Sequence, residues 1–218
     1  MKINVKEKII RLIILFIGLV IAHLGVTLFL LADLGADPFN VLIQGLFRLE
    51  ESTLCLSWLT HGRVHMGICF LIILILLIVD KTYIKLGTLV CMFFGGPIID
   101  VFTEMLTPIV NSDSGMPVRI IANVLGCVIL AYGMTIVIKS DAGTGPNDLV
   151  AVVISDKSGK KFSIIRVVVD VGFALIGFLL GGTIGVGTVI CAFLVGPVAG
   201  LFLPINDKLI NKILNRIL

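Results

Sequence analysis

Charged residues are scarce in this chain of 218 residues, because Asp, Glu, Lys and Arg together make up 14% of it. A soluble domain carries about a quarter. Aromatic residues reach only 7%, whereas hydrophobic residues make up 58% and the mean hydropathy is +1.15. A chain this apolar has too few polar side chains to cover itself in water. The composition argues against a soluble enzyme, a disordered linker, a secreted disulfide scaffold and a nucleic-acid binder, and it indicates an all-α polytopic membrane protein in the lipid bilayer.

Recognised catalytic and metal-binding motifs are also missing from the sequence. It contains no HExxH, GxSxG, P-loop or Rossmann glycine pattern and no CxxC, and its number of cysteines, 5, is odd. These absences predict a protein that is not an enzyme, has no metal site and needs no cofactor.

Long apolar runs predict the membrane spans. Six of them approach the ~20 residues that a helix needs to cross a bilayer. They are residues 12–32, 64–79, 86–110, 120–138, 164–180 and 186–205.

Two shorter apolar pieces, residues 38–49 and 146–154, are too short to span. In the first, Asn40, Gln44 and Arg48 recur every fourth residue and share one helix face. We therefore expect two short interfacial or re-entrant helices, the first of them amphipathic.

The basic residues predict the orientation. With six spans and a cytoplasmic N-terminus, 14 of the 17 Lys and Arg residues lie inside, and Arg48, Arg63 and Arg119 lie outside. This excess predicts that both termini lie in the cytoplasm. Eight spans would give the same tally, so only the lengths of the short pieces favour six.

The chain also resembles itself. Residues 35–42 return 108 positions later as 143–150, and residues 86–93 return 100 positions later as 186–193. We expect a first membrane repeat over residues 1–110 and a second over 111–218, which together form one membrane domain. Three spans per half would make the copies inverted, the arrangement favoured here, and four would make them parallel.

Paired glycine and proline residues point to a binding site. Gly96 and Pro97 are expected to interrupt the third span, and Gly196 and Pro197 the sixth. Paired breaks at corresponding positions of two halves are typical of a transporter's midplane site. The alternative is that glycine and proline only kink these helices for packing.

The starts of the two short helices are the second candidate site. Asp37, Pro38 and Asn40 open the first short helix, and Gly145 and Pro146 precede Asn147 and Asp148 in the second. Proline and Asx residues are N-terminal signals. Acidic residues at such a position suit a cation or a proton; plain capping is the alternative.

Ionisable residues within a span are the third candidate. Arg166 and Asp170 are four residues apart in the fifth span and can pair on one helix face. Charged groups at this depth usually face a bundle interior or a water-filled path. We favour Asp170 as a proton or substrate ligand, while Arg166 alone could extend to the interface.

These motifs resemble the YczE/YyaS/YitT family of bacterial membrane proteins. The first-half resemblance lies in residues 34–42 with Gln44-Gly45-Leu46. The second-half resemblance lies in residues 143–148, 166, 170, 180–188 and 196–197. It implies the fold and an inner-membrane location, and some members are linked to non-ribosomal peptide production.

The leading functional hypothesis is a small-solute transporter, proton-coupled, with an unknown substrate. One alternative is a membrane scaffold or assembly factor for a biosynthetic system, which would bind its partner through residues 156–162 and the basic C-terminal tail. Another is the substrate-capture subunit of an energy-coupled importer. The GxxxG patterns at 177–181 and 196–200 predict close helix packing within the bundle first and a homo-oligomer second.

Overall fold

The computed structural model describes residues 5–53, 58–160 and 162–217, so Lys2 and Lys161 of the charge tally and part of the expected partner-binding segment lie outside the described residues. The described residues are helical and contain no strand. The helices are α1 (Val5–Ala32), α2 (Pro38–Thr53), α3 (His61–Asp80), the short 3-10 helix η1 (Lys81–Tyr83), α4 (Leu86–Leu106), α5 (Met116–Ser140), α6 (Pro146–Ser158), α7 (Phe162–Leu179) and α8 (Val186–Ile217). The expected all-α polytopic membrane fold is confirmed.

Five described helices are long and apolar enough to cross a membrane: α1, α3 with η1, α4, α5 and α8. The fifth expected span, residues 164–180, corresponds to α7, which has 18 residues and is not among them. The count of six spans therefore stays a prediction.

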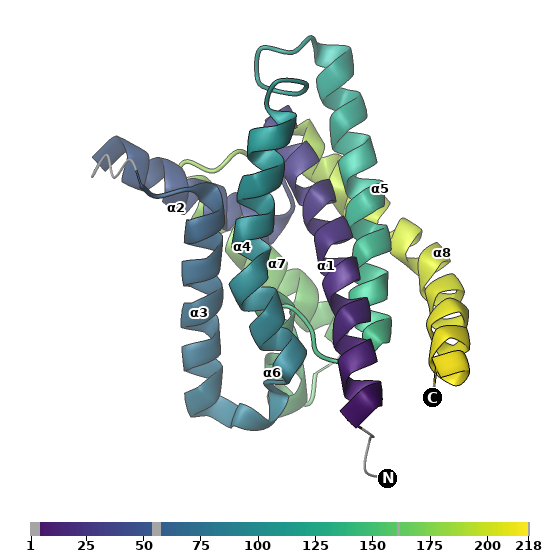
Figure 1. Ribbon diagram of the computed structural model, residues 1–218. Coiled ribbons are helices and arrows are strands. Elements are labelled where there is room, and N and C mark those ends of the chain that lie inside the picture. Colours follow the sequence, from purple (N-terminus) through teal and green to yellow (C-terminus); the bar gives the residue numbers. More distant parts are fainter. Residues whose placement is uncertain (1–4, 54–57, 161, 218) are drawn as a thin grey trace.

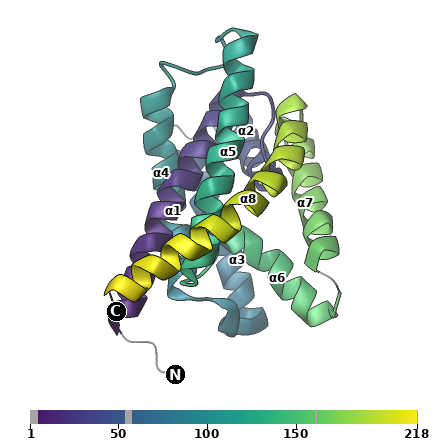
Figure 2. The same ribbon diagram turned by 90° about the vertical axis from the view of Figure 1, so that its right-hand side faces the viewer.

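The long helices run between two ends of the molecule, with a short helix at each end. Figure 1 shows α2 at the upper end and α6 at the lower end, near the turn between α3 and α4. The first described residue, Val5, and the last, Ile217, lie toward the lower end. Figure 2, turned by 90°, shows α7 running between α6 and α2, while α8 crosses α1 and α5 diagonally.

Local signals in the sequence set the starts of four helices. α2 and α6 begin at Pro38 and Pro146, as expected, because proline at the first helical position loses no helical hydrogen bond and has a suitable φ. α4 and α8 begin at Leu86 and Val186, where the matched apolar segments start.

The interfacial reading of α2 is wrong for its first two turns. Residues 39–45 are buried on every side of the helix, and Val41 and Ile43 have no exposed surface. Its polar residues Gln44 and Arg48 contact the link between α7 and α8 instead of facing headgroups. The sequence pattern predicted the polar stripe, but it did not predict that the link between α7 and α8 covers this stripe.

The expected interruptions at the Gly-Pro pairs are also wrong. α4 continues through Pro97, and α8 continues through Pro197 and Pro204. A proline removes one N–H donor and disturbs one turn. The backbone hydrogen bonds on either side still hold the helix together, as is common in membrane helices.

Glycines bring α1 and α5 into direct backbone contact. A Cβ added to Gly18 would lie 2.9 Å from the Gly133 oxygen, and one added to Gly25 would lie 2.5 Å from the Gly126 oxygen. Small residues allow this close approach, which gains van der Waals contact where the hydrophobic effect contributes little. This antiparallel pair forms the centre of the fold.

Reciprocal arginine contacts close the ends of the same two helices. Arg119 of α5 donates to the carbonyl oxygens of Ala32 (2.7 Å) and Asp33 (2.8 Å) at the end of α1. Arg11 of α1 donates to the Ser140 oxygen at the end of α5, at 3.1 Å. Arg11 and Arg119 are 108 positions apart, as are Ala32 and Ser140. Each arginine thus satisfies carbonyls that a helix end leaves unpaired.

Two backbone hydrogen bonds repeat this reciprocity. The Gly187 N–H donates to Leu34 O at 2.7 Å, and the Gly87 N–H donates to Ala142 O at 3.0 Å. The link after α1 is therefore bound to the start of α8, and the link after α5 to the start of α4. These bonds position residues 33–37 and 141–145, from which α2 and α6 begin.

We expect Gly25→Ala to lower the melting temperature of the purified protein clearly, because the new methyl group would meet the backbone of Leu130 and Gly126. Overpacking of this kind typically costs about 1–3 kcal/mol. Gly67→Ala on α3 is the matched control, since a Cβ there meets nothing within 4 Å. Equal melting temperatures for the two variants would contradict this interface.

Candidate functional site

A group of charged and polar side chains gathers where the two short helices begin beside α7. We call it the polar cluster. Its members are Asp37, Asn40, Asn147, Asp148, Arg166 and Asp170. All six were expected site residues, and together they contain three carboxylates and one guanidinium.

Asp37 caps the start of α2. Its carboxylate accepts from the backbone N–H of Asn40 (3.3 Å) and from Asn40 Nδ2 (2.6 Å). An Asx side chain that reaches the N–H of the third helical residue satisfies one of the free donors of a helix start. Pro38 fills the first helical position of α2, directly after Asp37.

Arg166 joins the start of α6 to α7. Its Nη1 donates to Asp148 Oδ1 at 2.6 Å, and its Nε donates to Asp170 Oδ2 at 2.9 Å. The expected pairing of Arg166 with Asp170 is therefore confirmed. Asp148 lies in the first turn of α6, where the helix dipole favours a negative charge. Asn147 Nδ2 donates to the same Asp148 oxygen at 3.2 Å.

Asp37 belongs to the cluster electrostatically, although it forms no ion pair with any of the described residues. It lies in the link before α2, outside the candidate spans. Burial raises the pKa of its carboxyl above the ordinary value. The hydrogen bonds from Asn40 and the charge of Arg166 act in the opposite direction, while Asp170 adds a smaller upward effect.

The Gly-Pro pairs do not take part in this cluster. Gly96 is buried against Gly62 of α3, and Pro97 is exposed. Gly196 and Pro197 are exposed, and a Cβ on Gly196 would meet nothing within 4 Å. Neighbouring helices approach only the first pair, and the predicted role of the two pairs in framing a site stays a prediction.

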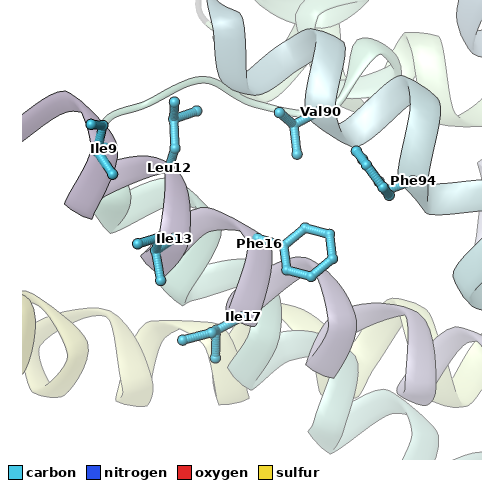
Figure 3. Close-up of a pocket in the computed structure, with 7 residues that line it drawn as sticks. All are labelled: Ile9, Leu12, Ile13, Phe16, Ile17, Val90 and Phe94. Carbon is cyan, nitrogen blue, oxygen red and sulfur yellow. The ribbon is translucent and has the colours of Figure 1, made fainter.

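The groove found on the surface is also separate from the cluster. It lies between α1 and α4 and is lined only by apolar side chains, as Figure 3 shows. They are Ile9, Leu12, Ile13, Phe16, Ile17, Val90 and Phe94. Most of them are exposed, so this groove has the character of a lipid-facing surface.

A polar network that the sequence did not reveal lies at the upper end. Arg48 donates to Asp33 Oδ1 (2.9 Å), to Thr183 Oγ1 (2.6 Å) and to Gly181 O (3.2 Å). The Thr183 N–H donates to Gln44 Oε1 at 2.8 Å. The spacing of Gln44 and Arg48 on one helix face indicated a polar stripe, but it did not reveal their common partner Thr183, which lies 135 or more positions away.

Two histidines also lie deep in the helical core. The rings of His23 and His65 meet edge to face with centroids 5.6 Å apart, and Phe39 packs on His65 at 5.5 Å. Phe39 also contacts Phe173 of α7 at 5.4 Å. This aromatic packing brings the start of α2 against α3 and α7. Over the parts of the chain that the structure describes, no group of three or more His, Cys, Asp or Glu side chains is placed to hold a metal ion.

Comparisons with known proteins relate the whole chain to bacterial proteins. Residues 9–204 match a family described as a family of unknown function, DUF6198. The chain is 28% identical over 212 residues to "Uncharacterized membrane protein YczE" of Bacillus subtilis (strain 168), covering 97% of this chain and 94% of that protein.

Two further relatives are similar over most of their length. An "Uncharacterized protein" of Haemophilus influenzae is 29% identical, over 90% of this chain and 84% of its own. "Uncharacterized protein YyaS" of B. subtilis is 28% identical, over 88% and 92%. No solved structure matches the chain. The expected resemblance to YczE and YyaS is confirmed, and the part that names YitT stays a prediction.

We expect Arg166→Gln to destabilise the protein by about 1–2 kcal/mol, because it leaves Asp148 and Asp170 without a cation in a half-buried setting. Arg166→Lys should restore only part of this, since one ammonium cannot reproduce the two-sided contact. Thermal melting in detergent measures both variants.

A double-mutant cycle tests the cause. In an Asp148→Asn background, Arg166→Gln should cost less than in the wild type, because one of the two carboxylates is already neutral. Arg216→Gln on the exposed end of α8 is the control and should not change stability. An equal cost of Arg166→Gln in both backgrounds would disprove the coupling.

Proposed function

We propose that this chain, which belongs to the DUF6198 family of unknown function, is a proton-coupled small-solute transporter of the bacterial cytoplasmic membrane rather than an enzyme. The observation that carries the proposal is the polar cluster, which places three carboxylates and one guanidinium between helices of a multi-pass membrane protein. Ionisable groups in such a setting are costly and usually mark a substrate or proton path.

The cluster also has the composition of a transport site. It forms where two short helices begin, so backbone N–H groups, side-chain amides and carboxylates are directed at one region. Helix starts near the midplane are recurrent binding elements in secondary transporters. We propose that these helices are the two equivalent elements of inverted repeats, which the reciprocal contacts of Arg11 and Arg119 support.

The contacts at the upper end of the molecule are close. A Cβ on Gly45 would collide with Gly177 O, and one on Gly177 would lie 2.5 Å from Leu42 N, so α2 and α7 touch backbone to backbone. The ion pair of Arg48 with Asp33 adds to this contact. We propose that this end is the external side, closed in the present conformation.

The contacts at the lower end are weaker. Tyr83 donates to Asp156 at 3.0 Å, and Lys157 lies 3.8 Å from Asp80, with all four side chains at or near the surface. Exposed ion pairs contribute little. A transporter closed on one side and loosely held on the other is the arrangement that alternating access requires. Movement of α7 would carry Arg166 and Asp170 with it.

In proteoliposomes, we expect Asp170→Asn to reduce solute-driven charge movement at least about tenfold, because a charge-assisted hydrogen bond worth roughly 1.5–3 kcal/mol is lost at the site. The recording would use solid-supported membranes and a panel of small cations, anions and zwitterions. Asp113→Asn in the exposed link between α4 and α5 is the control. Transport that is unchanged in Asp170→Asn removes this residue from the mechanism.

The membrane orientation has its own test. A single cysteine at Asp113 should react with an impermeant label from outside the cell, and one at Lys81 only from inside, because the two exposed positions lie at opposite ends of α4. A background in which the native cysteines are replaced by serine gives the baseline. The reverse pattern would indicate eight spans and parallel halves.

A further inference from the structure

The polar cluster contains more carboxylates than cations, and Asp37 is the carboxylate that is not bonded to the guanidinium of Arg166. Arg166 is bonded to both Asp148 and Asp170, so its positive charge is shared by two carboxylates. Among the described residues, the Asp37 carboxylate accepts two hydrogen bonds, both from Asn40. A carboxylate away from water is costly unless a proton or a cation neutralises it.

A second, independent observation lies beside this carboxylate. Asn40 is 5% exposed, and no group in the described part of the chain is hydrogen-bonded to its Oδ1. Its Nδ2 is bonded to Asp37 Oδ2, which places the amide group within the cluster. Buried polar atoms are almost always paired, so an unpaired acceptor here indicates a donor from outside the protein.

The chemistry of these two groups defines the ligand. Both Asp37 and Asn40 Oδ1 offer acceptors, so the ligand must supply N–H donors and a positive charge. No three His, Cys, Asp or Glu side chains of the described residues are placed to share one metal ion, which disfavours a divalent metal. We propose that Asp37 and Asn40 bind a small organic cation with N–H donors, an ammonium, amidinium or guanidinium group, and that this cation competes with a proton for Asp37. This inference rests on the proposed transport function for its physiological role, but binding can be measured without transport.

The surroundings of Asp37 fit such a competition. Asp37 interacts electrostatically with the opposite charges of Arg166 and Asp170 on α7 and with Cys191 on α8, and Asn40 adjoins it on α2. Burial favours the protonated carboxyl, so the empty site is neutral at low pH. A group whose pKa is raised on folding stabilises the protein below its unfolded value, and this contribution disappears as the pH rises through the folded value. A cation that replaces the proton should restore that stability at alkaline pH.

The experiment measures the melting temperature of the purified full-length protein with millimolar guanidinium chloride, far below the molar concentrations that denature proteins. Sodium chloride at equal concentration controls for ionic strength. Urea, a neutral molecule of similar shape, tests the charge, and tetramethylammonium, a cation without N–H donors, tests hydrogen bonding. At saturating guanidinium and alkaline pH, we expect a rise of about 5 °C or more over sodium chloride, and a smaller rise at acidic pH.

Variants assign the effect to the site. Asp37→Asn should abolish the guanidinium-dependent rise while keeping the fold, because asparagine caps a helix as well as aspartate does. Asn40→Ala should weaken the rise, and Asp113→Asn should leave it intact. An undiminished rise in Asp37→Asn, or a wild type that responds equally to guanidinium, urea and sodium chloride, overturns the proposal.

Failure of the inference and failure of the proposed function give different results. Guanidinium binding that depends on Asp37, without any transport in proteoliposomes, supports this site and contradicts the transport function. Transport of other solutes that depends on Asp170, with no guanidinium-dependent stabilisation, supports the transport function and contradicts the cation site.

Discussion

The last carbonyl groups of α1 and α5 lie within the protein, where water cannot pair them, and the rest of the arrangement depends on how they are satisfied. Each helix end receives an arginine from the other helix: Arg119 bonds the end of α1, and Arg11 bonds the end of α5. The links that follow are bonded to the starts of α8 and α4 through Gly187 and Gly87. Because an unpaired backbone group in a bilayer costs several kcal/mol, these contacts fix the chain path on both sides of the central helix pair.

This fixed path explains why charged residues occur inside the protein. The links 33–37 and 141–145 are held against the opposite half, so α2 and α6 must begin near α7. Their first turns supply Asp37 and Asp148, and α7 supplies Arg166 and Asp170. The contact of Arg166 with two carboxylates offsets part of the cost of burial, but it leaves Asp37 without a cation among the described residues.

The two ends of the molecule differ, although their elements correspond. At the upper end, α2 and α7 meet through glycine backbones, and at the lower end exposed side chains make the contacts between α6 and the turn after α3. Since α7 carries half of the charged residues of the cluster, its packing and the charge state of the cluster are physically linked. In the proposed transport cycle, movement of α7 would therefore alter the proposed cation site, and cation binding would alter the packing of α7.

The sequence by itself determined the membrane class, the helical content and the starts of α2, α4, α6 and α8. These features are local, because hydropathy and a proline at the first helical position act within a few residues. It also indicated Asp37, Asp148, Arg166 and Asp170, since charged residues in apolar surroundings stand out.

Only the tertiary structure decided which of these residues meet. It joined Asp37 to a site on α7 far along the chain, gave Arg48 its partner Thr183, and left Gly196 and Pro197 on the surface despite their match with Gly96 and Pro97. Such outcomes depend on which helix faces pack together. Spacing along one helix fixes which residues share a face, but the neighbour that covers this face is set by contacts between helices distant in sequence.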